Sequence, residues 1–309
     1  PRDWSSDVCS SDLYRTNGTA NGTTGFSDES ASFPFAAGKA TDAVFFDIVP
    51  DTDGMDVAVT YADHTGVIYR DKLAGRYEAQ PTPAIPAGAT AILAQDYNND
   101  GRTDLAAVTA NGVVLIANGE KGFQSAAPLA GKGVGLFADL DNRGLFDVLT
   151  QGNVYRNGGR KAFEAAAEAE LAQATALASA DFDADGRVDL AAVNANGDVQ
   201  LLTNQGDGMS KWFRVKLTGV KNLKTGYGSE VEIKAGAYYQ KQTYRGVPLY
   251  FGMGPRAQAE TVRISWPNGM IQNQVRENTG RAIEYKEAPR LSGSCPMIFT
   301  WNEIGRAHV

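Results

Sequence analysis

The stretch "LASADFDADGRVDL", residues 177–190, recurs along the chain and decides how the sequence is interpreted. Residues 92–105 read "ILAQDYNNDGRTDL", residues 135–148 read "GLFADLDNRGLFDV", and a fainter copy, "VFFDIVPDTDGMDV", spans residues 44–57. The first aspartates of the three clearer copies are 43 and 42 residues apart. A fixed period of this length is typical of repeat architectures, in which each repeat is one small structural unit.

Each repeat continues past its aspartates with several short strand patterns. An apolar run such as "DLAAVTA" follows the cluster, then a glycine-containing turn, a second run such as "GVVLIAN" or "GDVQLLTN", and in most copies a third such as "GFQSA". Each unit therefore offers about four strands in roughly 42 residues. We predict an all-β fold, a β-propeller-like array of about four and a partial four-stranded blades that share a core, followed by a small C-terminal β domain.

Residues 162–178, "AFEAAAEAELAQATALA", carry conflicting signals. Ala, Glu, Leu and Gln favour a helix on intrinsic propensity. The repeat alignment instead places the segment across a boundary between blades. Because packing overrides propensity, we predict strand or irregular structure there.

The aspartates of the last repeat have the spacing of a metal-binding loop. With Asp181 as position 1, carboxylates follow at positions 3, 5 and 9, and Gly186 at position 6 permits a sharp turn. Alternate carboxylates in a tightly curled loop converge on one point, and an all-oxygen shell suits calcium better than zinc or copper. We predict a structural Ca²⁺ ion. The ligands predicted here are Asp181, Asp183, Asp185, Asp189 and the carbonyl of Arg187 at position 7.

The other copies differ from this loop in their candidate ligands. The second copy is a good loop, whereas the third has Arg143 at position 5, where its guanidinium is expected to replace the metal by pairing with Asp139, Asp141 and Asp147. In the fainter copy the spacing after Gly54 is one residue short. The second loop's ligands are Asp96, Asn98, Asp100, the carbonyl of Arg102, and Asp104; weaker candidates are Asp139, Asp141 and Asp147, and Asp51, Asp53 and Asp56.

The spacing of the loops allows two other interpretations. An EF-hand needs a bidentate Glu at position 12 and flanking helices, but position 12 is Ala192 in the last loop and Ala107 in the second, between strand patterns. The remaining alternative is a solvated Asp/Asn/Gly turn that binds no metal.

The repeats resemble the FG-GAP-type repeats, also called VCBS repeats, over roughly residues 14–208. Loops of the form D-x-D/N-x-D-G-x-x-D bind calcium in the propellers of that family, so the resemblance implies a calcium-stabilised propeller. The aspartate clusters here are fewer than the blades of a closed propeller of the integrin type.

From Trp212 the aspartate loops cease, and "WFRVKLTG", "TGYGSEVEI", "LYFGMG" and "VRISWPNG" follow in order. This series resembles the ASPIC/UnbV domain, which in that family commonly follows VCBS repeats in exported proteins. Trp266 is expected in the core rather than on a sugar platform. Tyr238, Tyr239, Tyr244 and Tyr250 are candidates for an exposed aromatic face.

The two ends of the chain have no relation to what lies between them. Residues 3–13 and 303–309 resemble translated sequencing adapter, which is excluded from fold reasoning. The expected organisation is adapter at 1–13, propeller at 14–210, ASPIC/UnbV-like domain at 211–288, the start of a truncated segment at 289–302, and adapter at 303–309.

Composition argues against several classes of function. Without the adapter residues, 27 basic and 32 acidic residues remain, so nothing favours nucleic acid as a partner. No apolar run approaches the roughly 18 residues of a membrane helix. His64 is the one histidine left, expected in an exposed turn, and no G-x-S-x-G motif is present, so no catalytic residue is predicted.

These observations predict an exported, non-enzymatic, calcium-stabilised propeller that binds or adheres to a protein or glycan. The family resemblance implies a secreted, extracellular or cell-envelope location. The alternatives are a propeller enzyme that acts on polysaccharide or glycan, since propellers host many chemistries, and a structural module of a larger protein.

Overall fold

The structure is a computed structural model that describes residues 14–20, 23–28, 33–48, 54–73, 75–159, 162–206, 210–221, 223–288, 300–301 and 307–308. These residues have an all-β fold with antiparallel sheets arranged like blades, which confirms the predicted fold class. Within the described ranges, the helical element that is resolved is the single 3₁₀ turn η2 (Ala169–Leu171).

Three successive sheets contain four antiparallel strands each, in chain order. In each sheet the first strand leads into an aspartate loop, and the last aspartate of that loop begins the second strand. The strands are β3 (Ala40–Phe46), β4 (Asp56–Tyr61), β5 (Val67–Asp71) and β6 (Tyr77–Pro81); β7 (Ala91–Gln95), β8 (Asp104–Thr109), β9 (Gly112–Gly119) and β10 (Gly122–Ser125); and β11 (Leu136–Ala138), β12 (Asp147–Thr150), β13 (Asn153–Arg156) and β14 (Glu164–Ala167).

A strand pair precedes these sheets and a three-stranded sheet follows them. The pair is β1 (Tyr14–Ala20) and β2 (Thr23–Asp28), and the last sheet is β15 (Ala174–Ala180), β16 (Asp189–Asn194) and β17 (Val199–Leu202). The helix-like stretch 162–178 lies across β14, η2 and the start of β15, so the prediction of strand or irregular structure is confirmed.

The second strands of the sheets explain the continuous apolar runs in the sequence. All of β8 except its last residue is buried. Leu105 and Ala107 pack into the core shared with the preceding sheet, whereas Ala106 and Val108 pack into the core shared with the following sheet. Successive side chains of a strand point to opposite faces, so a strand covered on both faces has apolar residues throughout.

The C-terminal residues form a module of two sheets with a core of its own. Strand β18 lies between β21, which is antiparallel to it, and β24, which is parallel. The second sheet has the order β20-β19-β22-β23. The bounds are β18 (Lys211–Thr218), β19 (Glu230–Ala235), β20 (Tyr238–Thr243), β21 (Leu249–Gly254), β22 (Gln258–Ser265), β23 (Ile271–Asn278) and β24 (Arg281–Lys286), with the short pair β25 (Thr300–Trp301) and β26 (Ala307–His308) beyond.

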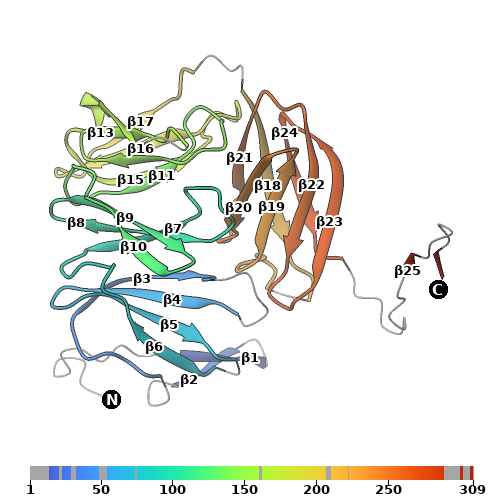
Figure 1. Cartoon of the computed structure of the whole chain (residues 1–309), viewed down its shortest axis with the longest axis horizontal. Coiled ribbons are helices and arrows are strands. Elements are labelled where there is room, and N and C mark those ends of the chain that lie inside the picture. Colours follow the sequence, from blue (N-terminus) through green and yellow to red (C-terminus); the bar gives the residue numbers. More distant parts are fainter. Residues whose placement is uncertain are drawn as a thin grey trace.

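Trp266 lies in the module core with 2% of its surface exposed, which confirms the prediction of a packing role. Figure 1 shows the blades stacked from β15–β17 to β3–β6, with the module along one side of the stack and β20 and β21 nearest to the blades. The region between the blades and the module is therefore bordered by both parts of the chain.

Candidate functional site

The aspartate at position 1 folds each of the three clearer loops. Its two carboxylate oxygens accept hydrogen bonds from the backbone N–H groups of positions 5 and 6, and each oxygen keeps a further lone pair for a cation. The bonds run to Asp181 from Asp185 (3.0 Å) and Gly186 (3.0 Å), to Asp96 from Asp100 (3.1 Å) and Gly101 (2.9 Å), and to Asp139 from Arg143 (3.0 Å) and Gly144 (2.6 Å).

The aspartate at position 9 joins its loop to the neighbouring blade through an asparagine. Asp189 accepts the backbone N–H of Asn204 at 2.7 Å, and the side-chain amide of Asn204 donates to the carbonyl of Leu140 in the preceding loop at 2.6 Å. In the same way, Asp104 accepts the backbone N–H of Asn118, whose side-chain amide donates to the carbonyl of Ile48. Asp147 accepts the backbone N–H of Asn157, whose side-chain amide donates to the carbonyl of Tyr97. Each of these asparagines is the last residue of a strand pattern that is visible in the sequence. Their role in joining the blades was not predicted.

The last loop gathers carboxylates as a metal site requires. One oxygen each from Asp181, Asp183 and Asp189 lie within 4.8 Å of one another, so this cluster could hold a metal ion. Asp185 does not belong to the cluster, because its carboxylate pairs with the guanidinium of Arg187. Three of the four predicted carboxylate ligands are therefore together.

The second loop contains a buried carboxylate oxygen that the protein leaves unsatisfied. Asp104 is fully buried, and its Oδ2 has no hydrogen-bond partner among the described residues. Burial raises the pKa of Asp104 to about 7 and that of Asp96 to about 6. A cation would satisfy the unpaired oxygen and remove the cost of burying these charges.

The two other predicted side-chain ligands of this loop curl its backbone. The side-chain oxygen of Asn98 accepts the N–H of Asp100 at 2.9 Å, and Asp100 accepts the N–H of Arg102 at 2.9 Å. Asn99 at position 4 has a positive φ of 57°. The loop has the tight turn that the spacing predicts.

Arginines occupy the third loop. The Arg143 guanidinium pairs with Asp141 and lies 3.8 Å from Asp147 Oδ1. Arg156 at the end of β13 approaches Asp147 Oδ2 at 2.8 Å, a partner that the sequence did not reveal. Asp139 instead accepts from the backbone, so the predicted Arg143 pairing holds for Asp141 and Asp147 and is wrong for Asp139.

The fainter loop lies partly outside the described residues, which do not include Asp51 and Asp53. Asp56 begins β4 and accepts the backbone N–H groups of Ile48 at 3.0 Å and Asp71 at 2.9 Å. The bond from Asp71 repeats the backbone bond that position 9 accepts in the other blades. Position 71 is an aspartate where those blades have an asparagine, so Asp56 shares the backbone part of the role.

Aromatic residues of the module lie on the glycines of the three clearer loops. Each glycine has a positive φ, and a Cβ atom there would contact or overlap an aromatic side chain of the module. Trp212 covers Gly186, Tyr238 covers Gly144 and Tyr239 covers Gly101. Glycine at position 6 is required by the turn and, at Gly186 and Gly144, also by the module.

Hydrogen bonds and an ion pair reinforce this contact. Asn142 accepts the N–H of Gly254 at 2.7 Å, and Arg214 of β18 lies 3.8 Å from Asp181. The loops are also bonded to one another, since Asn99 donates to the carbonyl of Gly144 at 2.7 Å and Asn142 to that of Gly186 at 2.9 Å. The module thus packs on the row of three loops, and this contact surface is called the seat of the module.

The candidate aromatic face is not formed. Tyr238 and Tyr244 are buried, and Tyr239 and Tyr250 are half-buried. Tyr238 and Tyr239 contact the blades, as described above, instead of facing solvent. His64 is half-buried rather than exposed: its ring stacks on Tyr61 in the first complete blade.

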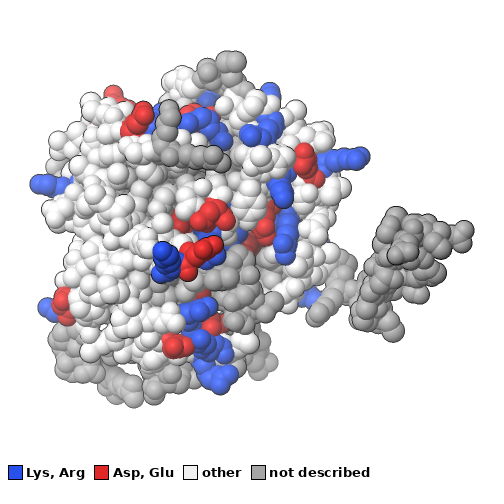
Figure 2. Space-filling view, in the orientation of Figure 1, with Lys and Arg blue, Asp and Glu red and all other residues white. Residues whose placement is uncertain are grey.

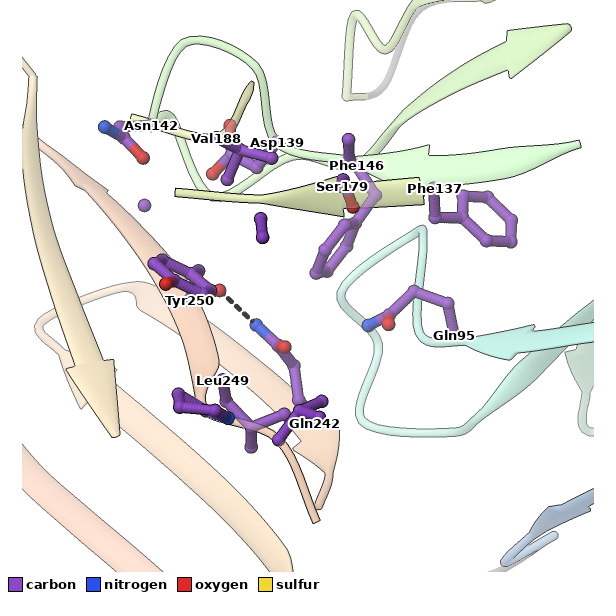
Figure 3. A pocket seen from close by; sticks show the side chains of 15 residues that line it. Gln95, Phe137, Asp139, Asn142, Phe146, Ser179, Val188, Gln242, Leu249 and Tyr250 are labelled. Carbon is purple, nitrogen blue, oxygen red and sulfur yellow. Dashed lines mark hydrogen bonds between the residues drawn. The ribbon is translucent and has the colours of Figure 1, made fainter. Parts of the chain in front are cut away.

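A cavity of 410 Å³ lies between the blades and the module (Figure 3). Gln95, Phe146 and Ser179 reach it from the blades, and Gln242 and Tyr250 reach it from the module. A second cavity of 340 Å³ shares Gln95, Ser179 and Gln242 with the first. The contact between the blades and the module therefore borders a partly open cavity with polar, aromatic and aliphatic walls.

The charged residues on the face shown in Figure 2 are of both signs and interspersed, and much of the blade surface in view is uncharged. Among the described residues, no helix has the length and apolar character needed to cross a membrane.

No family model matches the chain, and no curated protein matches it. Solved structures that the chain matches include the biofilm matrix protein Bap1 of V. cholerae (15% identity, 76% of this chain and 47% of that one, TM-score 0.32). Another is an Agrocybe aegerita lectin that recognises non-reducing terminal N-acetylglucosamine (17% identity, 76% and 66%, TM-score 0.34). A third is BBS1N in complex with ARL6DN (7% identity, 78% and 92%, TM-score 0.34). The chain spans less than two thirds of the first two.

Proposed function

We propose that the chain is an exported, non-enzymatic binding protein of the FG-GAP/VCBS and ASPIC/UnbV type, in which calcium at the aspartate loops holds the module on the blades. The observation that carries the proposal is the convergence of Asp181, Asp183 and Asp189 within 4.8 Å in a loop that directly seats the module. The ligand bound by the assembled protein is a protein or a glycan.

The chemistry of the loops supports calcium as the ion. Their side chains offer carboxylate and amide oxygens, which suit a hard cation. The unpaired Oδ2 of Asp104 supports a second ion in the loop at 96–104. Extracellular modules bind calcium with dissociation constants of about 10⁻⁴ to 10⁻³ M, which agrees with an exported protein.

The ion's contribution is structural. A divalent cation offsets the repulsion among the gathered carboxylates and so favours the curled loop. Gly101 and Gly186 lie under Tyr239 and Trp212 only while these loops keep that backbone path. Calcium binding and module seating thereby favour each other, because both need the same loop conformation.

Thermal unfolding of the full chain with excess calcium and with a chelator tests the proposal. Calcium at a hundredfold excess over its dissociation constant should raise the melting temperature by about 5 to 10 °C. Limited proteolysis between β17 and β18 should be faster in the chelator, because the module is then less firmly seated. Equal melting temperatures and equal cleavage rates in the two conditions would refute structural calcium.

A further inference from the structure

The cavity between blades and module contains hydrogen-bonding groups that the protein does not use. The Nε2 atom of Gln95 is buried without a partner among the described residues, and the half-buried Ser179 lines the same cavity with its hydroxyl-bearing side chain. Gln242 donates its amide N–H to the carbonyl of Tyr250 at 2.6 Å, which leaves its own carbonyl oxygen as an acceptor (Figure 3). A buried donor without a partner is costly, so these groups are expected to meet a ligand or ordered water.

These groups require a ligand that both donates and accepts hydrogen bonds. Gln95 Nε2 offers only donors, the Gln242 carbonyl oxygen only accepts, and the Ser179 hydroxyl does either. Hydroxyl groups meet all three needs, because each one donates once and accepts through its oxygen. The polar part of the cavity therefore fits a molecule with several hydroxyls.

The charge of the cavity argues for a neutral ligand. No Lys or Arg occurs among the described residues that line the 410 Å³ cavity. Its charged lining residue, Asp139, directs both oxygens to backbone N–H groups of Arg143 and Gly144. Within the 410 Å³ cavity an anionic ligand would meet this carboxylate without a compensating cation, whereas Lys241 and Arg245 line the adjoining 340 Å³ cavity.

Apolar side chains, aliphatic as well as aromatic, provide the remaining wall. Phe146 and Tyr250 reach the cavity from opposite parts of the chain (Figure 3). The C–H face of a sugar ring packs on such rings while its hydroxyls bond to the amides. The volume of 410 Å³ falls in the range of about 300 to 1,000 Å³ that ligand sites occupy, and such sites are common between domains.

We propose that this cavity is a binding site for a neutral saccharide, of the size of one or two sugar units, held by Gln95, Ser179 and Gln242. The inference rests on the proposed binding function and names its ligand class and place. Because the walls come from both parts of the chain, the site is complete only while the module is seated on the aspartate loops. Saccharide binding thus depends on the same loops that calcium stabilises.

Saturation-transfer NMR of the full chain in calcium tests this site. The probes are glucose, galactose, mannose, N-acetylglucosamine and their neutral disaccharides, with glucuronate as the anionic comparison. At least one neutral sugar should bind, and glucuronate should bind more weakly. Gln95→Leu and Ser179→Ala should each weaken that sugar about tenfold, because each removes a hydrogen bond from an enclosed site.

Gln200→Leu is the matched control, since Gln200 lies exposed on β17, and it should leave binding unchanged. The site is rejected if no neutral sugar binds, if glucuronate binds best, or if Gln95→Leu and Ser179→Ala bind as the parent does. Melting each protein with calcium and with chelator separates the two proposals. A calcium-dependent melt without sugar binding rejects the saccharide site alone.

Discussion

The loops at 139–147 and 181–189 have the same backbone turn and the same place in their blades, yet they hold their charges differently. In the first, Arg143 and Arg156 neutralise the carboxylates of Asp141 and Asp147. In the second, Asp183 and Asp189 converge with Asp181 into a cluster that could hold an ion.

The difference shows that the backbone and the side chains of the loop have independent roles. Its backbone seats the module in both cases, through Gly144 under Tyr238 and Gly186 under Trp212. Its side chains determine whether a side-chain cation or a metal ion offsets the carboxylates. A repeat without such a cluster can therefore keep its place in the structure, provided that an arginine supplies the charge.

The largest effect is expected from adding a side chain beneath the module. Gly186→Ala places a Cβ atom at a φ of 86° and against Trp212, so it should lower the free energy of unfolding by about 2 to 5 kcal/mol. Gly197→Ala is the control, because Gly197 has the same φ of 86° and open space around it, and should cost about 1 to 2 kcal/mol. Urea unfolding measures both; equal losses would show that the loop does not seat the module.

Exchanging the residue at position 5 tests the charge difference directly. Asp185→Arg should let a guanidinium pair with Asp183 and Asp189, as Arg143 pairs with Asp141 and Asp147. The calcium-dependent part of the stability should then fall by about 2 to 3 kcal/mol at a hundredfold calcium excess. Arg143→Lys is the control, because it keeps the charge and should leave the calcium response unchanged. Persistence of the full response in Asp185→Arg would contradict the proposed ion site.

A smaller effect is expected at the arginine-filled loop. Arg156→Gln leaves the buried Asp147 with one guanidinium, and because Arg156 is itself 44% exposed the cost should be only about 1 to 2 kcal/mol. The loss should be the same with calcium and with a chelator. A loss that appears only in calcium would mean that this loop binds the ion too.

The loops were predictable from sequence wherever the signal is local. The 42-residue period and the strand runs indicate the blades, and Arg143 lies within its own loop, two residues from Asp141. The ion pair of Arg156 with Asp147 was not predicted, because only the pairing of β12 with β13 brings the two residues together. The packing of Trp212, Tyr238 and Tyr239 on the loops was not predicted either, since no sequence pattern places a distant domain on a loop.

The smallest effect is a pH dependence that calcium should remove. Burial raises the pKa of Asp104 to about 7 and of Asp96 to about 6, above the value of about 3.9 in an unfolded chain. Calcium-free protein should therefore gain stability as the pH falls from 7 to 4, and lose it as the pH rises from 4 to 7.

In calcium the same carboxylates must stay ionised to bind the ion, so acidification should no longer stabilise the protein through this loop. Urea unfolding at pH 5 and pH 7.5, with calcium and with chelator, measures the change. Asp104→Asn should reduce the response of the calcium-free protein. A calcium-free protein that is less stable at pH 5 than at pH 7.5 would contradict the assigned direction.

The most direct test of the central claim is the number of calcium ions bound by three matched variants at position 9, measured by isothermal titration of the full chain. Asp104→Asn and Asp189→Asn should each lose one ion relative to the parent, because each removes a carboxylate ligand. Asp147→Asn should lose none, because arginines already occupy its loop. A parent chain that binds no calcium, or three variants with the same number of ions, would contradict the account.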